Sequence, residues 1–183
     1  LRFNRSSEQV HDEFINVPHD ALLRVSEDLV TGISFFMRFR MLSLAEDGGE
    51  PATLFEKTDT DPITDGIRVC VTSDGKLQVS YRNESIAYAR ETTAGTITTN
   101  TVYDLWITFN KTGNVVKVYV NNVEKSLSVI SQLGWHADQT NFDMTIMTMR
   151  LGTSAGPLYE DLYDFRIYTE QAVSAAQVGF HFT

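Results

Sequence analysis

The chain has 183 residues, of which 42% are hydrophobic and 21% charged, with a formal net charge of -9 at pH 7 and a sequence pI of about 4.8. This composition is typical of a soluble globular protein with one sizeable core, whereas the acidic balance opposes nucleic acid and anionic membrane surfaces, which bind basic footprints. No stretch approaches the roughly 20 apolar residues that insertion into a membrane requires, and the single cysteine, Cys70, excludes an internal disulfide.

The organisation of the chain predicts one domain over residues 1–183. Four prolines and 11 glycines are scattered singly between apolar runs, and no linker or internal repeat interrupts them. The chain opens at Leu1 without methionine or a signal peptide. We therefore expect a domain excised from a larger protein.

Alternating apolar residues predict strands near the N-terminus. Residues 14–17, before Pro18, are typical of a short edge strand. Residues 33–41 form the strongest period-two run in the chain. One face of that run is entirely apolar, and the other carries Arg38 and Arg40.

The next apolar runs predict a strand and a hairpin. Residues 53–57 form a brief strand, and residues 67–71 pair with residues 77–81. The intervening Ser-Asp-Gly at residues 73–75 is a strong hairpin signal, because Gly tolerates the backbone angles of a tight turn. Arg68 and Cys70 fall on the polar side of the first strand. Residues 86–90 and 96–98 continue the meander.

The central feature is a hairpin over residues 103–122. Leu105, Ile107 and Phe109 alternate with residues 106 and 108 before the turn, and Val116, Val118 and Val120 alternate with residues 117 and 119 after it. Each strand therefore has one apolar face. Trp106 and Tyr119 have the opposite, outward parity. Two paired strands with one apolar face are not stable alone, so a second sheet must cover that face.

The C-terminal third predicts further strands and one helix. Residues 126–133 fit either a strand or a single helical turn, and residues 144–151 and 158–168 fit strands. In the last of these, Tyr163, Phe165 and Ile167 share one face under strict alternation. Residues 169–178 form the one plausible helix. Many short strands with frequent turns indicate an antiparallel sandwich.

The order of three motifs resembles the laminin-G-like domains of the concanavalin A-like lectin and glucanase superfamily. The first is Phe-Ile-Asn-Val-Pro at residues 14–18 with the strand that follows, and the second is the hairpin over residues 105–122. The third is Leu-Gly at 151–152, Asp-Phe-Arg-Ile-Tyr at 164–168 and Val-Ser-Ala-Ala-Gln-Val at 173–178. The resemblance implies an all-β, two-sheet antiparallel jelly-roll sandwich (concanavalin A-like) with a short C-terminal helix. Members include lectins, carbohydrate-binding modules, adhesion domains and enzymes, so fold alone does not choose the function.

Catalysis in this superfamily requires paired carboxylates on one strand face. The nearest candidate is the acidic run at residues 160–164, where Glu160 and Asp164 share a parity under strict alternation but a third acid is missing. No nucleophile elbow or phosphate loop occurs. We therefore expect no enzyme, and a polysaccharide hydrolase or lyase is the third alternative.

Glycan binding requires flat aromatic faces and hydrogen-bonding forks. Candidates with outward parity, together with one aromatic residue in a loop, are Arg38, Arg40, Arg68, Trp106, Tyr119, Trp135 and Arg150. Arginines on an exposed sheet face favour an acidic sugar. Alternatively, these residues form an ordinary solvated face, because arginine stems cover exposed strand surface without any ligand.

The acidic residues make calcium the candidate cofactor. Asp59, Asp61 and Asp65 lie in one loop, and Ca²⁺ prefers clustered carboxylate and carbonyl oxygens. The resemblance separately implies a structural calcium position at Asp164. Asp-rich loops are otherwise common as soluble turns.

The sequence therefore predicts a non-catalytic, extracellular or cell-surface recognition module that binds a glycan, through an exposed sheet face and loops, on a rigid scaffold. The first alternative is a protein- or peptide-binding adhesion domain of the same fold, whose partner is a cell-surface or extracellular protein.

Overall fold

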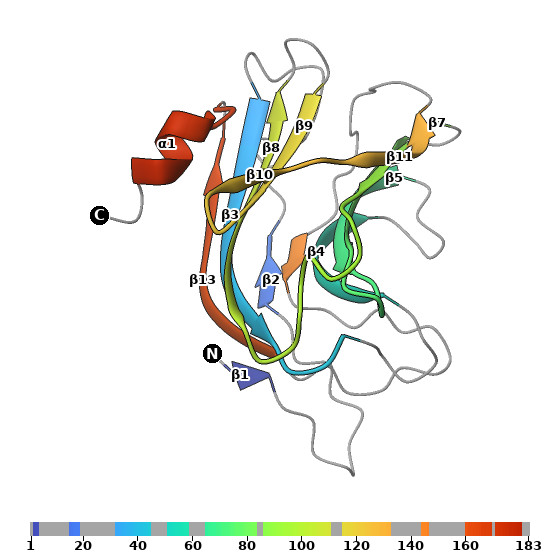
Figure 1. Cartoon of the computed structure of the whole chain (residues 1–183). Coiled ribbons are helices and arrows are strands. Elements are labelled where there is room, and N and C mark those ends of the chain that lie inside the picture. Colours follow the sequence, from blue (N-terminus) through green and yellow to red (C-terminus); the bar gives the residue numbers. More distant parts are fainter. Residues whose placement is uncertain are drawn as a thin grey trace.

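Two antiparallel sheets face each other across an apolar core (Figure 1). This computed structural model describes residues 2–3, 15–18, 32–44, 51–58, 65–83, 86–110, 115–132, 144–146, 160–169 and 171–180. Sheet A contains, in spatial order, β1 (Arg2–Phe3), β13 (Glu160–Tyr168), β3 (Gly32–Met41), β8 (Val102–Asn110), β9 (Val115–Val120) and β10 (Val123–Lys125). Sheet B contains, in the same way, β11 (Ser128–Gln132), β7 (Ile86–Glu91), β6 (Leu77–Asn83), β5 (Asp65–Val71), β4 (Ala52–Thr58), β12 (Met144–Ile146) and β2 (Ile15–Val17).

The alternating apolar faces meet between the sheets, as the sequence predicts. Phe35, Ile107 and Val118 are at most 1% exposed. Phe55 of sheet B packs against Phe35 and Phe165 of sheet A, with ring centroids 4.8 and 5.6 Å apart. Aromatic contacts of this kind add to the burial that drives the two layers together. The prediction of an antiparallel jelly-roll sandwich is confirmed.

Both predicted hairpins have the expected register. In the central hairpin Leu105 pairs with Val120 and Ile107 with Val118. In the other hairpin, Val69 pairs with Val79 across the turn at residues 73–75. The meander then leaves the sheet at residues 92–101, which form turns and not the expected strand at 96–98.

Two turn glycines provide a matched pair for a stability test. Gly75 and Gly95 have φ of 75° and 71°, but a Cβ on Gly75 would lie 2.2 Å from the carbonyl oxygen of Ile97, whereas a Cβ on Gly95 meets nothing within 4 Å. We expect Gly95→Ala to cost about 1–2 kcal/mol, the usual penalty for a left-handed residue with a Cβ. Gly75→Ala should cost clearly more, because backbone must move. Equal losses in urea denaturation would contradict this account.

The C-terminal helix begins later than predicted. α1 spans Ala175–Phe180 and follows four non-helical residues. The amide of Ser174 donates to Oε1 of Gln177 at 2.9 Å, and the Ser174 hydroxyl donates to the same oxygen at 2.8 Å. These contacts resemble a capping box, which fixes the helix start at Ala175. The described helical residues have neither the length nor the apolar character of a membrane span.

β13 contains a bulge that strict alternation does not anticipate. Leu162 pairs with Phe39 and Asp164 with Arg38, so Tyr163 is an extra residue. As a result, Leu162, Phe165 and Ile167 face the core, and Tyr163 is 52% exposed. The prediction that Tyr163 shares a face with Phe165 and Ile167 is wrong, because the bulge reverses the parity.

The remaining predicted strands are confirmed in part. β11 resolves the choice at residues 126–133 in favour of a strand, and β12 covers the first three residues of the run predicted over 144–151. Residues 147–151 lie outside the described residues. β10 and β11 connect the two sheets along one side of the sandwich (Figure 1).

Candidate functional site

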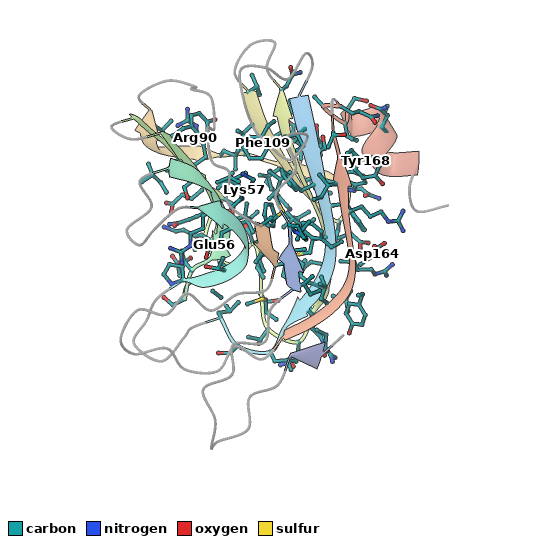
Figure 2. All side chains as sticks on the ribbon, turned by 180° about the vertical axis from the view of Figure 1, so that it is seen from behind. Glu56, Lys57, Arg90, Phe109, Asp164 and Tyr168 are labelled. Atoms are coloured by element: carbon teal, nitrogen blue, oxygen red, sulfur yellow. The ribbon has the colours of Figure 1, made fainter. Side chains whose placement is uncertain are left out.

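The predicted ligand residues lie on two opposite faces of the sandwich. Arg38, Arg40, Trp106 and Tyr119 belong to the outer face of sheet A, and Arg68 belongs to the outer face of sheet B. Figure 2 shows this separation through Asp164 and Glu56, which project away from each other on the two outer sides. Trp135 and Arg150 lie outside the described residues. The predicted residues therefore do not form one site.

Trp106 and Tyr119 are wrong as exposed ligand residues. They are 0% and 1% exposed, in a second apolar cluster with Phe36, Val173 and Val178. Burial raises the pKa of the Tyr119 phenol. Their outward parity is correct, but residues 171–178 and α1 cover that part of the face (Figure 1).

Ser34 attaches the covering segment to the sheet. Its buried hydroxyl accepts a hydrogen bond from the amide of Val173 at 2.9 Å and donates one to the carbonyl of Gln171 at 2.8 Å. The hydroxyl therefore acts both as a donor and as an acceptor. Phe36, Trp106 and Tyr119 therefore belong to a second core and do not form a binding platform.

The rest of the outer face of sheet A is a set of ion pairs. Arg40 donates through Nε to Asp161 Oδ2 at 2.8 Å, and this hydrogen bond raises the pKa of the guanidinium. Arg38 lies 3.5 Å from Asp104, and Arg166 lies 2.6 Å from Asp164. Arg38, Arg40 and Arg166 thus each have a carboxylate beside them.

The calcium predictions receive no support from these contacts. Asp164 is engaged by Arg166, and a cation next to the carboxylate fits Ca²⁺ poorly. Asp65 opens β5 but its side chain is not described, and Asp59 and Asp61 lie outside the described residues. Within the described part of the chain, no three His, Cys, Asp or Glu side chains gather around a common point.

The bulge in β13 also changes the acidic run. Asp161 shares the outer face with Asp164, because Asp161 pairs with Arg40 and Asp164 with Arg38. Both carboxylates form ion pairs with arginines, Asp161 with Arg40 and Asp164 with Arg166.

The carboxyl of Asp104 should make the free energy of unfolding depend on pH. Burial raises the pKa of this carboxyl, against the opposing effect of Arg38, whose side chain is 51% exposed. Because the folded state then binds the proton more tightly, the stabilisation is present below the unfolded pKa and is lost as pH rises through the folded pKa. Asp104→Asn should therefore gain stability relative to wild type between pH 3.5 and pH 7 in urea denaturation. A constant difference between the two proteins would contradict this.

Arg68 sits in a sheltered polar site on sheet B. Its Nε and Nη2 donate to the hydroxyl of Thr53 at 3.0 and 2.9 Å, and its Nε lies 3.8 Å from Oε2 of Glu56. A bulge at Leu54 places Thr53 and Glu56 on one face of β4 although they are three residues apart. The bulge thus assembles both partners around the guanidinium.

Cross-strand pairing defines the surroundings of Arg68. Two adjacent rows across β4, β5, β6 and β7 make up what we call the Arg68 site: Glu56, Arg68, Ser80 and Ala89 in one row, and Thr53, Cys70, Gln78 and Glu91 in the next. Ser80 and Ala89 are small, so nothing bulky stands beside Arg68 across β6 and β7.

Every side chain of the Arg68 site is buried or half-buried, although the site lies on an outer sheet face. The side chains of Arg68 and Glu56 are 19% and 9% exposed, compared with 51% for Arg38 on sheet A. Gln78 Nε2 donates to Glu91 Oε2 at 3.1 Å, and Lys76 Nζ donates to Glu91 Oε1 at 3.0 Å. The site is therefore a sheltered network of paired donors and acceptors.

Sequence reasoning found Arg68 and missed its partners. Thr53 and Glu56 belong to opposite faces under strict alternation, and only the bulge brings them together. The sequence does carry a signal of the bulge. Leu54 and Phe55 are consecutive apolar residues, and both are buried, which a strictly alternating strand does not allow on one face.

Comparison with known proteins supports the fold. A chain from "Ruminococcus gnavus IT-sialidase CBM40 bound to alpha2,3 sialyllactose" matches with a TM-score of 0.60 at 14% identity, covering 91% of this chain and 94% of that one. The binding domain of Paraclostridial Mosquitocidal Protein 1 matches with a TM-score of 0.67 at 11% identity, over 99% of this chain and 51% of that one. The chain is a lectin-like jelly roll.

The lectin-like jelly roll is also shared with a heptameric SAP-like pentraxin from Limulus polyphemus, at a TM-score of 0.59 and 14% identity over 97% of this chain and 78% of that one. No protein-family model matches the sequence, and no curated protein matches it significantly. At these identities the likeness establishes the fold of this lectin-like jelly roll and not its ligand.

Proposed function

We propose that this lectin-like jelly roll is a non-catalytic, extracellular or cell-surface recognition module that binds a glycan at the Arg68 site. The observation that carries the proposal is the sheltered guanidinium of Arg68, held by Thr53 and flanked by Glu56 on an outer sheet face. A fixed arginine beside a carboxylate offers donors and acceptors together, as sugar hydroxyls require.

The proposal draws additional support from the fold. One similar chain is a carbohydrate-binding module bound to sialyllactose, and others are binding domains of toxins. The finer assignment to the laminin-G-like group within this fold is part of the proposal, on the order of the three sequence motifs. The carboxylates of Asp161 and Asp164 on sheet A are engaged by arginines, which supports a non-catalytic role.

A glycan array with the purified domain tests the proposal. We expect binding to a restricted set of structurally related glycans, unchanged by a chelator, because calcium has no part in the Arg68 site. Silence across neutral and acidic glycans at high protein concentration would refute the glycan function.

A specific feature favours the alternative of an adhesion domain. Val123, Val129 and Ile130 are 57%, 58% and 50% exposed on the β10 and β11 side of the sandwich. Exposed apolar side chains gathered on one short segment are typical of protein contacts. Binding to a protein ligand that Ile130→Lys abolishes, with an array that stays silent, would favour this alternative.

A further inference from the structure

The described arginines that suggest an acidic sugar are all compensated by carboxylates. Arg38 lies 3.5 Å from Asp104, Arg40 lies 2.8 Å from Asp161, and Arg68 lies 3.8 Å from Glu56. The chain as a whole carries a formal charge of -9. An acidic ligand would therefore approach a negative protein and find no uncompensated cation among these three arginines.

The charges of the Arg68 site are also balanced. Glu56 has a side chain only 9% exposed, so water does little to screen it from a group bound at Arg68. Along the next row, Glu91 is paired with Lys76 at 3.0 Å. The formal charges of these four side chains cancel. A ligand carboxylate would gain attraction from Arg68 and lose it again to Glu56.

The hydrogen-bonding inventory points the same way. The carboxylates of Glu56 and Glu91 are acceptors only, so a ligand can use them only if it brings its own donors. Saccharide hydroxyls both donate and accept, whereas ionised carboxylate or sulfate groups only accept. Arg68 already donates hydrogen bonds through Nε and Nη2 to the hydroxyl of Thr53, whereas its Nη1 does not contact that hydroxyl.

Resting on the proposed function, we infer that the Arg68 site selects an uncharged, hydroxyl-rich saccharide and rejects the acidic counterpart of the same glycan. Arg68 donates to a sugar oxygen, and Glu56 accepts from a sugar hydroxyl. Specificity then comes from the repulsion that Glu56 imposes on anions as much as from attraction.

Matched glycan pairs test this inference. Lactose and sialyllactose form one pair, and gluco-oligosaccharides with their uronic acid analogues form another, each titrated by calorimetry at 20 and 500 mM NaCl. We expect the neutral member of the pair that is recognised to bind at least tenfold more tightly, with an affinity that salt does not change.

The Glu56→Gln variant removes the compensating charge and keeps the side-chain shape. We expect it to bind the acidic member at least fivefold more tightly than wild type does. Glu124→Gln is the control, because Glu124 pairs with Lys117 in an exposed position on sheet A. It should leave the preference unchanged.

The outcomes separate the inference from the proposed function. Tighter wild-type binding of the acidic member, weakened by 500 mM NaCl, would overturn the inference and leave the glycan function standing. Failure of wild type to bind either member of any pair would overturn both. Because the salt series uses wild type alone, the test holds even if Glu56→Gln folds poorly.

Discussion

Trp106→Ala is expected to lower the free energy of unfolding by about 3–5 kcal/mol, among the largest effects of any single substitution in this chain. The indole is fully buried, with ring centroids 5.0 Å from Phe36 and 5.3 Å from Tyr168. Its removal leaves a cavity between sheet A and the covering segment, which includes Val173 and Val178. Urea denaturation followed by circular dichroism measures the loss.

Tyr163→Ala is the control for this substitution. Tyr163 is also an aromatic residue of sheet A, but it is 52% exposed at the bulge. Its loss should change stability by only about 0.5 kcal/mol, as for most surface positions. If Trp106→Ala left stability unchanged and impaired ligand binding instead, Trp106 would be the exposed ligand residue that its parity suggests. The covering role of residues 171–178 would then be refuted.

Arg68→Met is expected to weaken glycan binding by about tenfold to hundredfold, since a hydrogen bond to a charged group contributes about 1.5–3 kcal/mol. Methionine keeps much of the apolar stem and removes the guanidinium that Thr53 holds. Calorimetry with the tightest ligand of the array provides the affinity, measured well below the melting temperature. The variant should also melt earlier, because Glu56 loses its cation.

Arg38→Met is the matched control. Arg38 also lies on an outer sheet face and also pairs with a carboxylate, but its side chain is 51% exposed and it belongs to sheet A. We expect its affinity for the same glycan to equal that of wild type. An equal loss of binding in both variants would mean that overall charge, and not the Arg68 site, governs recognition.

The strands of the core could be predicted from the sequence, because period-two alternation responds directly to burial. Phe35, Ile107 and Val118 are core residues in a run where every second side chain is apolar. The turn residues of the two hairpins also fix the register, and with it the cross-strand partner of each hairpin residue.

The bulges could not be predicted by strict alternation, and both change which side chains share an outer face. In β13 the apolar residues Leu162 and Phe165 are out of phase, which signals an extra residue that alternation alone ignores. In β4 the same kind of shift joins Thr53 to Glu56. Local periodicity thus identified Arg68 but not the partners that make it a candidate site.

The burial of Trp106 could not be predicted for a different reason. Parity assigns a side chain to one side of its sheet but says nothing about what else lies there. The covering segment comes from more than 60 residues further along the chain, and Ser34 and Val173 join it to the sheet through a hydrogen bond between residues 139 positions apart.

The position of the last strand has a consequence for how the protein forms during synthesis. β4, β5, β6 and β7 are consecutive antiparallel neighbours and can pair as soon as they leave the ribosome. β3 lies between β8 and β13 in sheet A, so one edge of β3 stays unpaired until β13 has been synthesised. A nascent chain that stalls before residue 160 would expose that edge together with the outer apolar side chains of Phe36, Trp106 and Tyr119, which Val173 and Val178 cover in the complete fold. Such incomplete chains are prone to aggregate.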